Sequence, residues 1–337
     1  MATMHDVARR AGVSVATVSF VLNNSKSLSA ATRTRVENAI EELGYRRNPV
    51  GAALARGKTK IIGLLYPALE RPLSGTAVQF ITAATERAKA RGYNLVIWPV
   101  RNDGLEAAAI ASTGLVDGLL LMEVEMSDER IPALTKGTTP FALIGRPADP
   151  SGMTYVDVDF ESSIDEAFRI LNGKGHTSFA LVIDGWGSSG TNTHGAVVRS
   201  RERFLNTAAR TGTLGQVFYC REDSVEGRKF GRMIVREYPD ITALLLMTER
   251  AASGILMGIR DCGKDVPSDI SIISIGSSKH MAATTDPDLT FMRSPAQELG
   301  HLGVDSIIDR IEKPDAAPPA VLIPCDFHKG SSIAPAP

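Results

Sequence analysis

Short apolar runs alternate with longer amphipathic stretches from residue 61 to residue 323. Apolar residues at three- and four-residue intervals indicate helices, whereas short continuous apolar runs are typical of strands buried on both faces. Such alternation implies right-handed βαβ units on a parallel sheet. The pattern predicts strands at 61–66, 94–98, 116–122, 141–144, 179–183, 217–220, 243–247, 270–275 and 321–323. It predicts helices at 77–91, 105–113, 161–171, 197–210, 227–237, 251–262 and 297–311.

These units are too many for one compact sheet, so we expect the body, residues 60–330, to form two lobes. Ligands of open α/β sheets bind at the carboxyl ends of the strands, which places a ligand between the lobes. Residues 331–337 carry no pattern of this kind and contain two prolines. We therefore expect them to form a frayed, flexible tail.

Residues 1–46 show helical periodicity only, in short segments. Thr3 followed by Asp6 is typical of a helix start, and Gly12 is typical of its end. Ser14 then caps a second helix, in which Thr17 lies three residues after the cap. Two short helices joined by a glycine turn predict a helix-turn-helix.

One face of the second helix is available to the major groove, because its other face carries the apolar stripe of the head. The available face holds Ala16, Ser19, Phe20 and Asn23, with Val15 at the start of the helix. The apolar members can sense thymine methyl groups but cannot make bidentate hydrogen bonds to bases. The alternative for Phe20 is packing on the linker.

A third helix begins near Ser29, with Thr32 three residues later, and ends at Gly44. Arg33 lies at its start, where a cation suits a phosphate contact. The alternative interpretation of the whole head is a small helical bundle whose polar face meets only water.

Charge supports the DNA-binding interpretation of the head. The first 60 residues hold ten Lys or Arg and four Asp or Glu, whereas the remaining 277 residues hold 27 and 34. A basic segment joined to an acidic body indicates a nucleic-acid partner. A solvated basic face without a partner is the alternative.

The linker, residues 47–59, encodes a short helix. Asn48 suits its cap, Pro49 its first position and Gly57 its end. A helix of this length is marginal in water, and Gly51 weakens it further. Leu54 is expected to wedge into a minor-groove base step, to pack two linker helices together in a dimer, or to do both.

Other features narrow the class of protein. Three widely spaced cysteines predict neither a disulfide framework nor a zinc cluster, and they fit the cytoplasm. No apolar leader or membrane-length run is present in the sequence, so we expect no membrane association. No G-x-S-x-G, H-E-x-x-H or P-loop sequence appears, so we expect no enzyme activity and no cofactor.

Two competing functions remain. Residues 185–190 spell the G-x-G-x-x-G fingerprint of an NAD(P)-dependent oxidoreductase. The next strand-end acids, Glu222 and Asp223, lie about 32 residues beyond Gly190, where that motif needs roughly 20. The other alternative is a sugar-binding protein of the periplasmic type without a regulatory role.

Together these residues resemble the LacI/GalR family of ligand-responsive transcription factors. The head matches in Asp6-Val7-Ala8, Ala11-Gly12-Val13-Ser14, Thr17-Val18-Ser19, Val21-Leu22-Asn23, Ser29, Thr32-Arg33, Val36 and Leu43-Gly44-Tyr45. The body matches in Ile62-Gly63-Leu64-Leu65, Val116-Asp117-Gly118, the run 266–271, Leu289-Thr290, Arg293-Ser294-Pro295 and Glu298-Leu299-Gly300. The resemblance implies an α/β protein with an all-α helix-turn-helix head and a two-lobed, periplasmic-binding-protein-like body. It also implies a cytoplasmic, nucleoid-associated homodimeric repressor of operator DNA.

The resemblance assigns the roles of individual residues. Val15, Ala16 and Phe20 match base-reading positions, and Leu54 matches the minor-groove leucine of the hinge helix. The predicted DNA contacts are Thr3, Ser14, Val15, Ala16, Thr17, Phe20, Asn23, Ser29, Thr32, Arg33 and Leu54.

The resemblance also implies an effector, a sugar or related metabolite. The family's Asn-Asp pair reads Thr248-Glu249 here, its next Asp reads Gly276, and its arginine falls on Ser200, which Arg199 and Arg201 flank. The predicted effector contacts are Arg146, Trp186, Arg199, Arg201 and Glu249, with surface or salt-bridge roles as the alternative.

Overall fold

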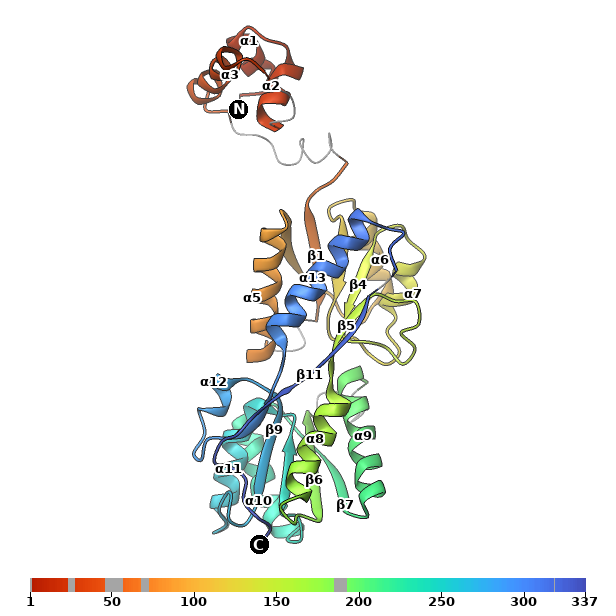
Figure 1. The fold of residues 1–337 in the computed structure, drawn as a ribbon, viewed down its shortest axis with the longest axis vertical. Helices are drawn as coiled ribbons and strands as arrows, with labels where there is room; N and C mark the ends of the chain where they lie inside the picture. Colours follow the sequence, from red (N-terminus) through yellow and green to blue (C-terminus); the bar gives the residue numbers. More distant parts are fainter. Residues whose placement is uncertain (1, 24–27, 46–56, 68–72, 185–192, 318) are drawn as a thin grey trace. The chain divides into compact units, whose positions relative to one another are not determined.

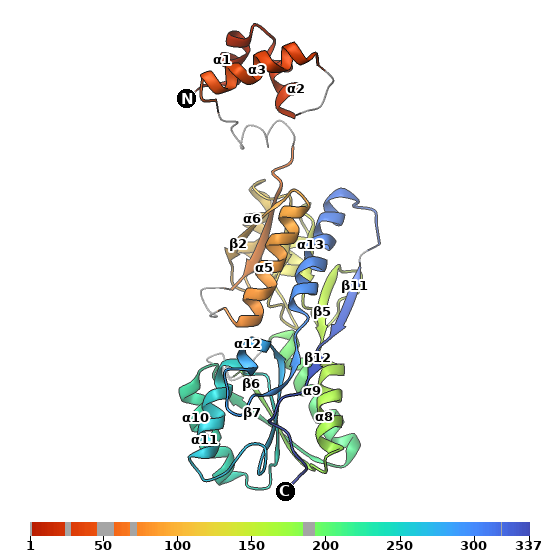
Figure 2. The ribbon, with the colours of Figure 1, turned by 60° about the vertical axis from the view of Figure 1, so that its left-hand side comes forward.

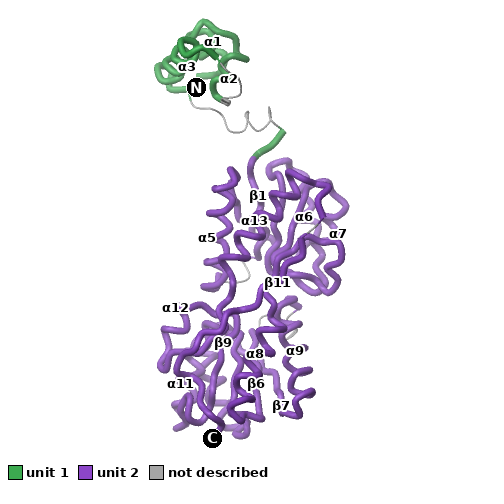
Figure 3. Tube along the Cα trace, viewed as in Figure 1, with its two compact units in different colours: residues 1–59 green, residues 60–337 purple. Residues whose placement is uncertain are grey.

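The computed structural model describes the chain except residues 1, 24–27, 46–56, 68–72, 185–192 and 318. It separates into two compact units, Met1–Thr59 and Lys60–Pro337 (Figure 3). The predictions for the linker helix, for Leu54, for Trp186 and for the fingerprint at 185–190 lie outside the described residues.

The described part of the first unit is a small helical head (Figure 1). Its helices are α1 (Met4–Ala11), α2 (Val15–Asn23) and α3 (Ala30–Glu42). One residue from each helix is fully buried in the centre, namely Val7, Val18 and Val36. An ion pair of 2.6 Å between Arg10 and Glu42 adds a contact between α1 and α3.

The first lobe of the second unit is a parallel sheet in the order β11-β5-β4-β3-β1-β2. Helices α5 and α13 pack side by side on one face, and α6 and α7 cover the other. The strands alternate between the two cores, since Ile62 and Leu64 face α5 and α13 while Leu65 faces α6 and α7. The strands are β1 (Ile61–Tyr66), β2 (Asn94–Pro99), β3 (Gly118–Leu121), β4 (Phe141–Ile144), β5 (Tyr155–Asp159) and β11 (Ala320–Pro324), and the helices are α5 (Gly75–Ala90), α6 (Gly104–Ser112), α7 (Arg130–Thr135) and α13 (Ala296–Glu312).

The second lobe has a sheet in the order β12-β10-β9-β8-β6-β7, parallel except for β12. Figure 2 shows α10 and α11 on one side of this sheet and α8 and α9 on the other. The strands are β6 (Ser178–Asp184), β7 (Leu214–Cys220), β8 (Ala243–Leu246), β9 (Ser271–Ser277), β10 (Thr290–Arg293) and β12 (Asp326–His328). The helices are α8 (Phe160–Asn172), α9 (Gly195–Thr211), α10 (Ser224–Glu237), the 3₁₀ turn η1 (Glu249–Ala251), α11 (Ala252–Arg260) and α12 (Lys279–Ala282).

The predicted two-lobed α/β body is therefore confirmed, with differences in detail. Within the described ranges, the chain passes between the lobes from β5 to α8, from β10 to α13, and from β11 to β12. The pattern missed β5, β10 and β12, because polar residues interrupt these short strands. Among the described residues, no helix combines the length and the apolar character that a membrane crossing needs.

Helices α10 and α11 approach each other through glycines. Gly227 and Gly231 of α10 face Gly254 and Gly258 of α11. A Cβ atom on any of the four would lie 1.9–2.3 Å from a backbone oxygen of the other segment. Only glycine permits this separation between the two helix backbones.

The prediction of a frayed tail at 331–337 is wrong. The Ser332 side chain is fully buried, and its Oγ donates to the Ile272 carbonyl at 2.6 Å and accepts from the Thr290 amide at 2.8 Å. The Ala334 amide donates to Ser271 Oγ at 2.9 Å. The tail lies against the second lobe because its backbone groups find partners there, which local sequence does not reveal.

Candidate DNA-binding face and effector cleft

Side chains cap each helix of the head. Thr3 and Asp6 form a reciprocal capping box, in which the Thr3 amide donates to Asp6 Oδ2 at 3.0 Å. The amide of Thr17 donates to Ser14 Oγ at 3.1 Å, and that of Thr32 donates to Ser29 Oγ at 3.2 Å. These hydroxyls fix where α1, α2 and α3 begin, as the sequence predicted.

The predicted reading face on α2 is partly open. Val18 and Val21 are buried, whereas Ala16 is exposed and Val15 and Phe20 are half-buried. Val15 also packs against the head core, so part of its surface serves the fold. Arg33 at the start of α3 is half-buried, and the side chain of Asn23 lies outside the described residues.

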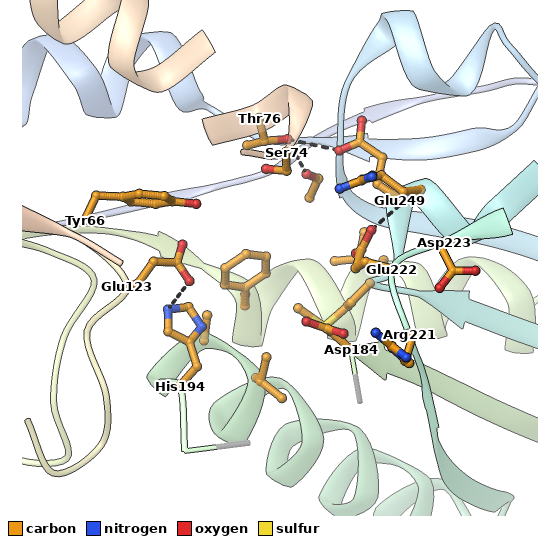
Figure 4. Close-up of a pocket in the computed structure, with 17 residues that line it drawn as sticks. Tyr66, Ser74, Thr76, Glu123, Asp184, His194, Arg221, Glu222, Asp223 and Glu249 are labelled. Atoms are coloured by element: carbon orange, nitrogen blue, oxygen red, sulfur yellow. Dashed lines mark hydrogen bonds and ion pairs between the residues drawn. The ribbon is translucent and has the colours of Figure 1, made fainter. Parts of the chain in front are cut away.

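A cleft of about 470 Å³ lies between the two lobes of the second unit. This volume is within the range of small-molecule sites. Figure 4 shows Tyr66 and Glu123 of the first lobe on one side and Asp184, Glu222, Asp223 and Glu249 of the second lobe opposite them. The first lobe also contributes Ser74 and Thr76.

Strand order brings three of these acids together. Asp184 ends β6, Glu222 follows β7 and Glu249 follows β8. Strand β6 lies between β7 and β8 and is parallel to both, so the three carboxyl ends share one edge of the sheet. The cleft has formed at the place where open α/β sheets bind ligands.

Contacts across the cleft join the two lobes. Thr76 Oγ1 donates to the Gly276 carbonyl at 3.1 Å and to Glu249 Oε2 at 3.4 Å. His194 Nε2 lies 3.3 Å from Glu123 Oε2. The Gly195 amide donates to the Val124 carbonyl at 2.9 Å, so the start of α9 is tied to the first lobe.

Burial changes the acidity of the deeper carboxyls. It raises the pKa of Glu222 to about 7; the Arg250 amide, at 3.0 Å, lowers this pKa, while Asp184 and Glu249 raise it further. Burial also raises the pKa of Glu249, although hydrogen bonds from Ser278 and Thr76 oppose this effect. The desolvated carboxyls resist becoming charged.

Of the predicted effector contacts, Glu249 lines the cleft, whereas Arg146, Arg199 and Arg201 are not among its lining residues. Arg199 is buried and donates to Asp157 at 2.7 Å, and Arg146 contacts Asp157 at 3.2 Å and Glu161 at 2.7 Å. Burial raises the pKa of Asp157 to about 6, although Arg199 and Arg146 lower it. These arginines therefore join the lobes through carboxylates, as the salt-bridge alternative expects.

Sequence reasoning did not assign Glu123, Asp184, His194 or Glu222 to the cleft. The usable signal was an acid within two residues of the end of a predicted strand, which Asp184 and Glu222 both satisfy. Among the described residues, no group of three or more His, Cys, Asp or Glu side chains is arranged to hold a metal ion.

Two family models match the chain. Residues 3–48 match the bacterial regulatory proteins of the lacI family, and residues 168–333 match the periplasmic binding protein-like domain. Similar proteins include catabolite control protein A of Staphylococcus xylosus, 26% identical over 96% of each chain. The HTH-type transcriptional regulator pepR1 of Lactobacillus delbrueckii subsp. lactis is 26% identical over 98% of this chain and 97% of its own.

Solved structures share the fold. The lac repressor dimer bound to operator and the anti-inducer ONPF matches with a TM-score of 0.85, at 22% identity over 99% of both chains. The complex of the transcriptional regulator CelR with cellobiose matches with a TM-score of 0.71, at 22% identity over 98% of this chain and 100% of that one. With its helix-turn-helix head and its two-lobed body, the chain belongs to the lacI family of bacterial DNA-binding transcriptional regulators.

Proposed function

We propose that the chain is a repressor whose head reads operator DNA and whose cleft binds a small polar effector that changes operator affinity. The observation that carries the proposal is the cleft of about 470 Å³ bounded by both lobes, in a chain with a lacI-family head. A ligand that contacts both walls binds one lobe orientation better than others and therefore shifts the equilibrium between them.

In this proposal α2 enters the major groove. Ala16 is its exposed apolar contact, and Val15 and Phe20 add the surface that the head core leaves open. The proposed phosphate contacts lie at the starts of the head helices, where backbone amides and the Arg33 guanidinium favour an anion. These contacts are Thr3, Ser14, Thr17, Ser29, Thr32 and Arg33.

A sugar or related metabolite is the proposed effector. Hydroxyl-rich ligands suit a wall that combines carboxylates with Ser74, Thr76 and Tyr66. Related structures include the CelR complex with cellobiose and an Enterococcus faecium lacI-family regulator with bound ribose. Binding of this kind needs no catalytic group, and we assign the cleft a regulatory role.

A homodimer is the proposed working form. Val96 and Ile97 are exposed on β2, which is the edge strand of the first sheet. In the second lobe, Val225 of α10 and Met257 of α11 are 66% and 51% exposed. Exposed apolar side chains on an edge strand and on neighbouring helices are typical of an interface.

Selection from random duplexes tests the DNA-binding part. We expect the full chain to enrich a near-palindromic site and Ala16→Glu to lose that site. Asn38→Glu adds the same charge at an exposed position of α3 and is expected to retain the site preference. Enrichment of one site by all three proteins would refute the role of α2.

A further inference from the structure

The charge of the cleft is uneven. Its described lining includes five carboxyl side chains, namely Glu123, Asp184, Glu222, Asp223 and Glu249. The arginines of the same lining, Arg221 and Arg250, are exposed, whereas Glu222 and Glu249 are half-buried, enough for desolvation to raise the pKa of both. Figure 4 shows Asp184, Glu222, Asp223 and Glu249 on the second-lobe wall, with Glu123 on the first-lobe side opposite them.

Glu249 and Glu222 differ in the hydrogen bonds that stabilise their carboxylates. Glu249 accepts from Ser278 Oγ at 2.7 Å and from the Ser278 amide at 3.3 Å. Glu222 accepts from the Arg250 amide at 3.0 Å and is held at a raised pKa by burial and by two neighbouring acids. Hydrogen bonds from neutral groups leave the negative field of this wall in place, and a low-dielectric cavity strengthens that field.

We propose that the cleft selects a ligand with a protonated amine beside its hydroxyls, such as an amino sugar, and excludes phosphorylated or carboxylated sugars. This inference rests on the proposed effector function and adds its charge class. An ammonium group placed against Asp184, Glu222 and Glu249 offsets their repulsion and can donate up to three hydrogen bonds. An anion in the same place meets three carboxyls in a confined space.

The selection has a pH signature. Among the described residues, Asp184, Glu249 and Arg250 act electrostatically on Glu222, and its chain neighbours Arg221 and Asp223 line the same cleft. A bound ammonium favours the ionised form of Glu222, so binding releases a proton near neutral pH. An anionic ligand would instead cause proton uptake.

The test uses glucosamine, glucose and glucose 6-phosphate, with chitosan dimer and cellobiose as larger probes, on the full chain at pH 7. We expect at least one amine-bearing probe to bind about tenfold more tightly than its neutral parent, with proton release in calorimetry in two buffers. Glu222→Gln and Asp184→Asn should each reduce that preference for the amine. Glu226→Gln is the matched control and should retain the preference, because the Glu226 side chain pairs with Lys229 at 2.6 Å and is not part of the cleft lining.

Three results would each overturn the charge proposal. They are tighter binding of glucose 6-phosphate than of glucosamine, an unchanged preference for the amine in both cleft variants, and no binding of any amine-bearing probe. The effector proposal fails separately. The effector proposal is retained if only glucose or cellobiose binds and changes operator affinity. Both proposals are refuted if no probe binds and none changes operator affinity.

Discussion

The glycine contact between α10 and α11 supports a quantitative prediction for Gly254→Ala. The added Cβ would lie 1.9 Å from the Ser224 carbonyl oxygen and 2.9 Å from the Arg228 amide nitrogen. Both atoms belong to the backbone at the start of α10 and cannot turn away as a side chain would. The two helices must separate by about 1 Å to relieve the shortest contact.

The magnitude follows from two opposed effects. Overpacking of this kind destabilises by about 1–3 kcal/mol, or more where the backbone must move. Alanine favours a helix over glycine by about 1 kcal/mol, which offsets part of the loss. Because backbone atoms must move here, the upper end of the overpacking range, about 3 kcal/mol, applies, so we expect a net loss of about 2 kcal/mol in the free energy of unfolding and a Tm lower by about 4–8 °C.

The same displacement reaches the cleft. Glu222 lies two residues before α10, and Glu249 begins the turn that leads into α11. We therefore expect Gly254→Ala to weaken effector binding as well as stability, since a shift of this size disturbs the spacing of two cleft carboxyls.

Thermal unfolding of the full chain, followed by far-UV circular dichroism, measures the first effect. Gly75→Ala is the matched control, because a Cβ at this first residue of α5 meets its nearest atoms at an ordinary 3.7 Å. A Tm for Gly254→Ala equal to or above that of the wild type would refute the packing argument.

Further predictions concern other parts of the chain. The folded pKa of Glu222, about 7, exceeds its unfolded value of 4.5, so stability from this group is present below pH 4.5 and is lost as pH rises through 7. Glu222→Gln should therefore be more stable than wild type at pH 8, by at most about 3 kcal/mol, and equal at pH 4; urea titrations at both pH values check this. Deletion of residues 331–337 should lower the Tm by several degrees, because buried hydrogen bonds to β9 and β10 are lost; an unchanged Tm would mean that the tail contributes nothing. Arg130→Met leaves Asp128 buried without its guanidinium partner at 2.7 Å and should destabilise by about 3–5 kcal/mol, whereas the double variant with Asp128→Leu should recover much of this loss in urea unfolding. Leu54→Ala should reduce both operator affinity and operator bending in gel-shift and circular-permutation assays; no change in either contradicts the wedge role.

Local features of the chain were enough to predict the helices of the head. The pairs Thr3 with Asp6 and Ser29 with Thr32 are caps whose hydrogen bonds span three residues, so their meaning is independent of the rest of the fold. The long buried strands could also be predicted from sequence. A continuous apolar run such as that of β6 indicates a strand that is covered on both faces of the sheet.

Long-range contacts decided the cleft. Asp184, Glu222 and Glu249 are far apart in sequence and meet because β6 lies between β7 and β8. The family resemblance implied Arg199 as an effector contact because it flanks Ser200, yet Asp157, 42 residues away, accepts its hydrogen bond. Which charge pairs with which depends on the geometry between the lobes, and no local pattern encodes it.

The chain's own pattern thus established a helix-turn-helix head, a two-lobed α/β body and the edge of the sheets where a ligand would bind, because capping, periodicity and burial act over a few residues. The tertiary structure alone decided that the cleft wall is acidic, that two predicted arginines join the lobes, that four glycines set the spacing of α10 and α11, and that the last seven residues pack against the second lobe. These properties arise where segments distant in sequence come within a few ångströms, since desolvation, charge pairing and steric contact depend on distance in space.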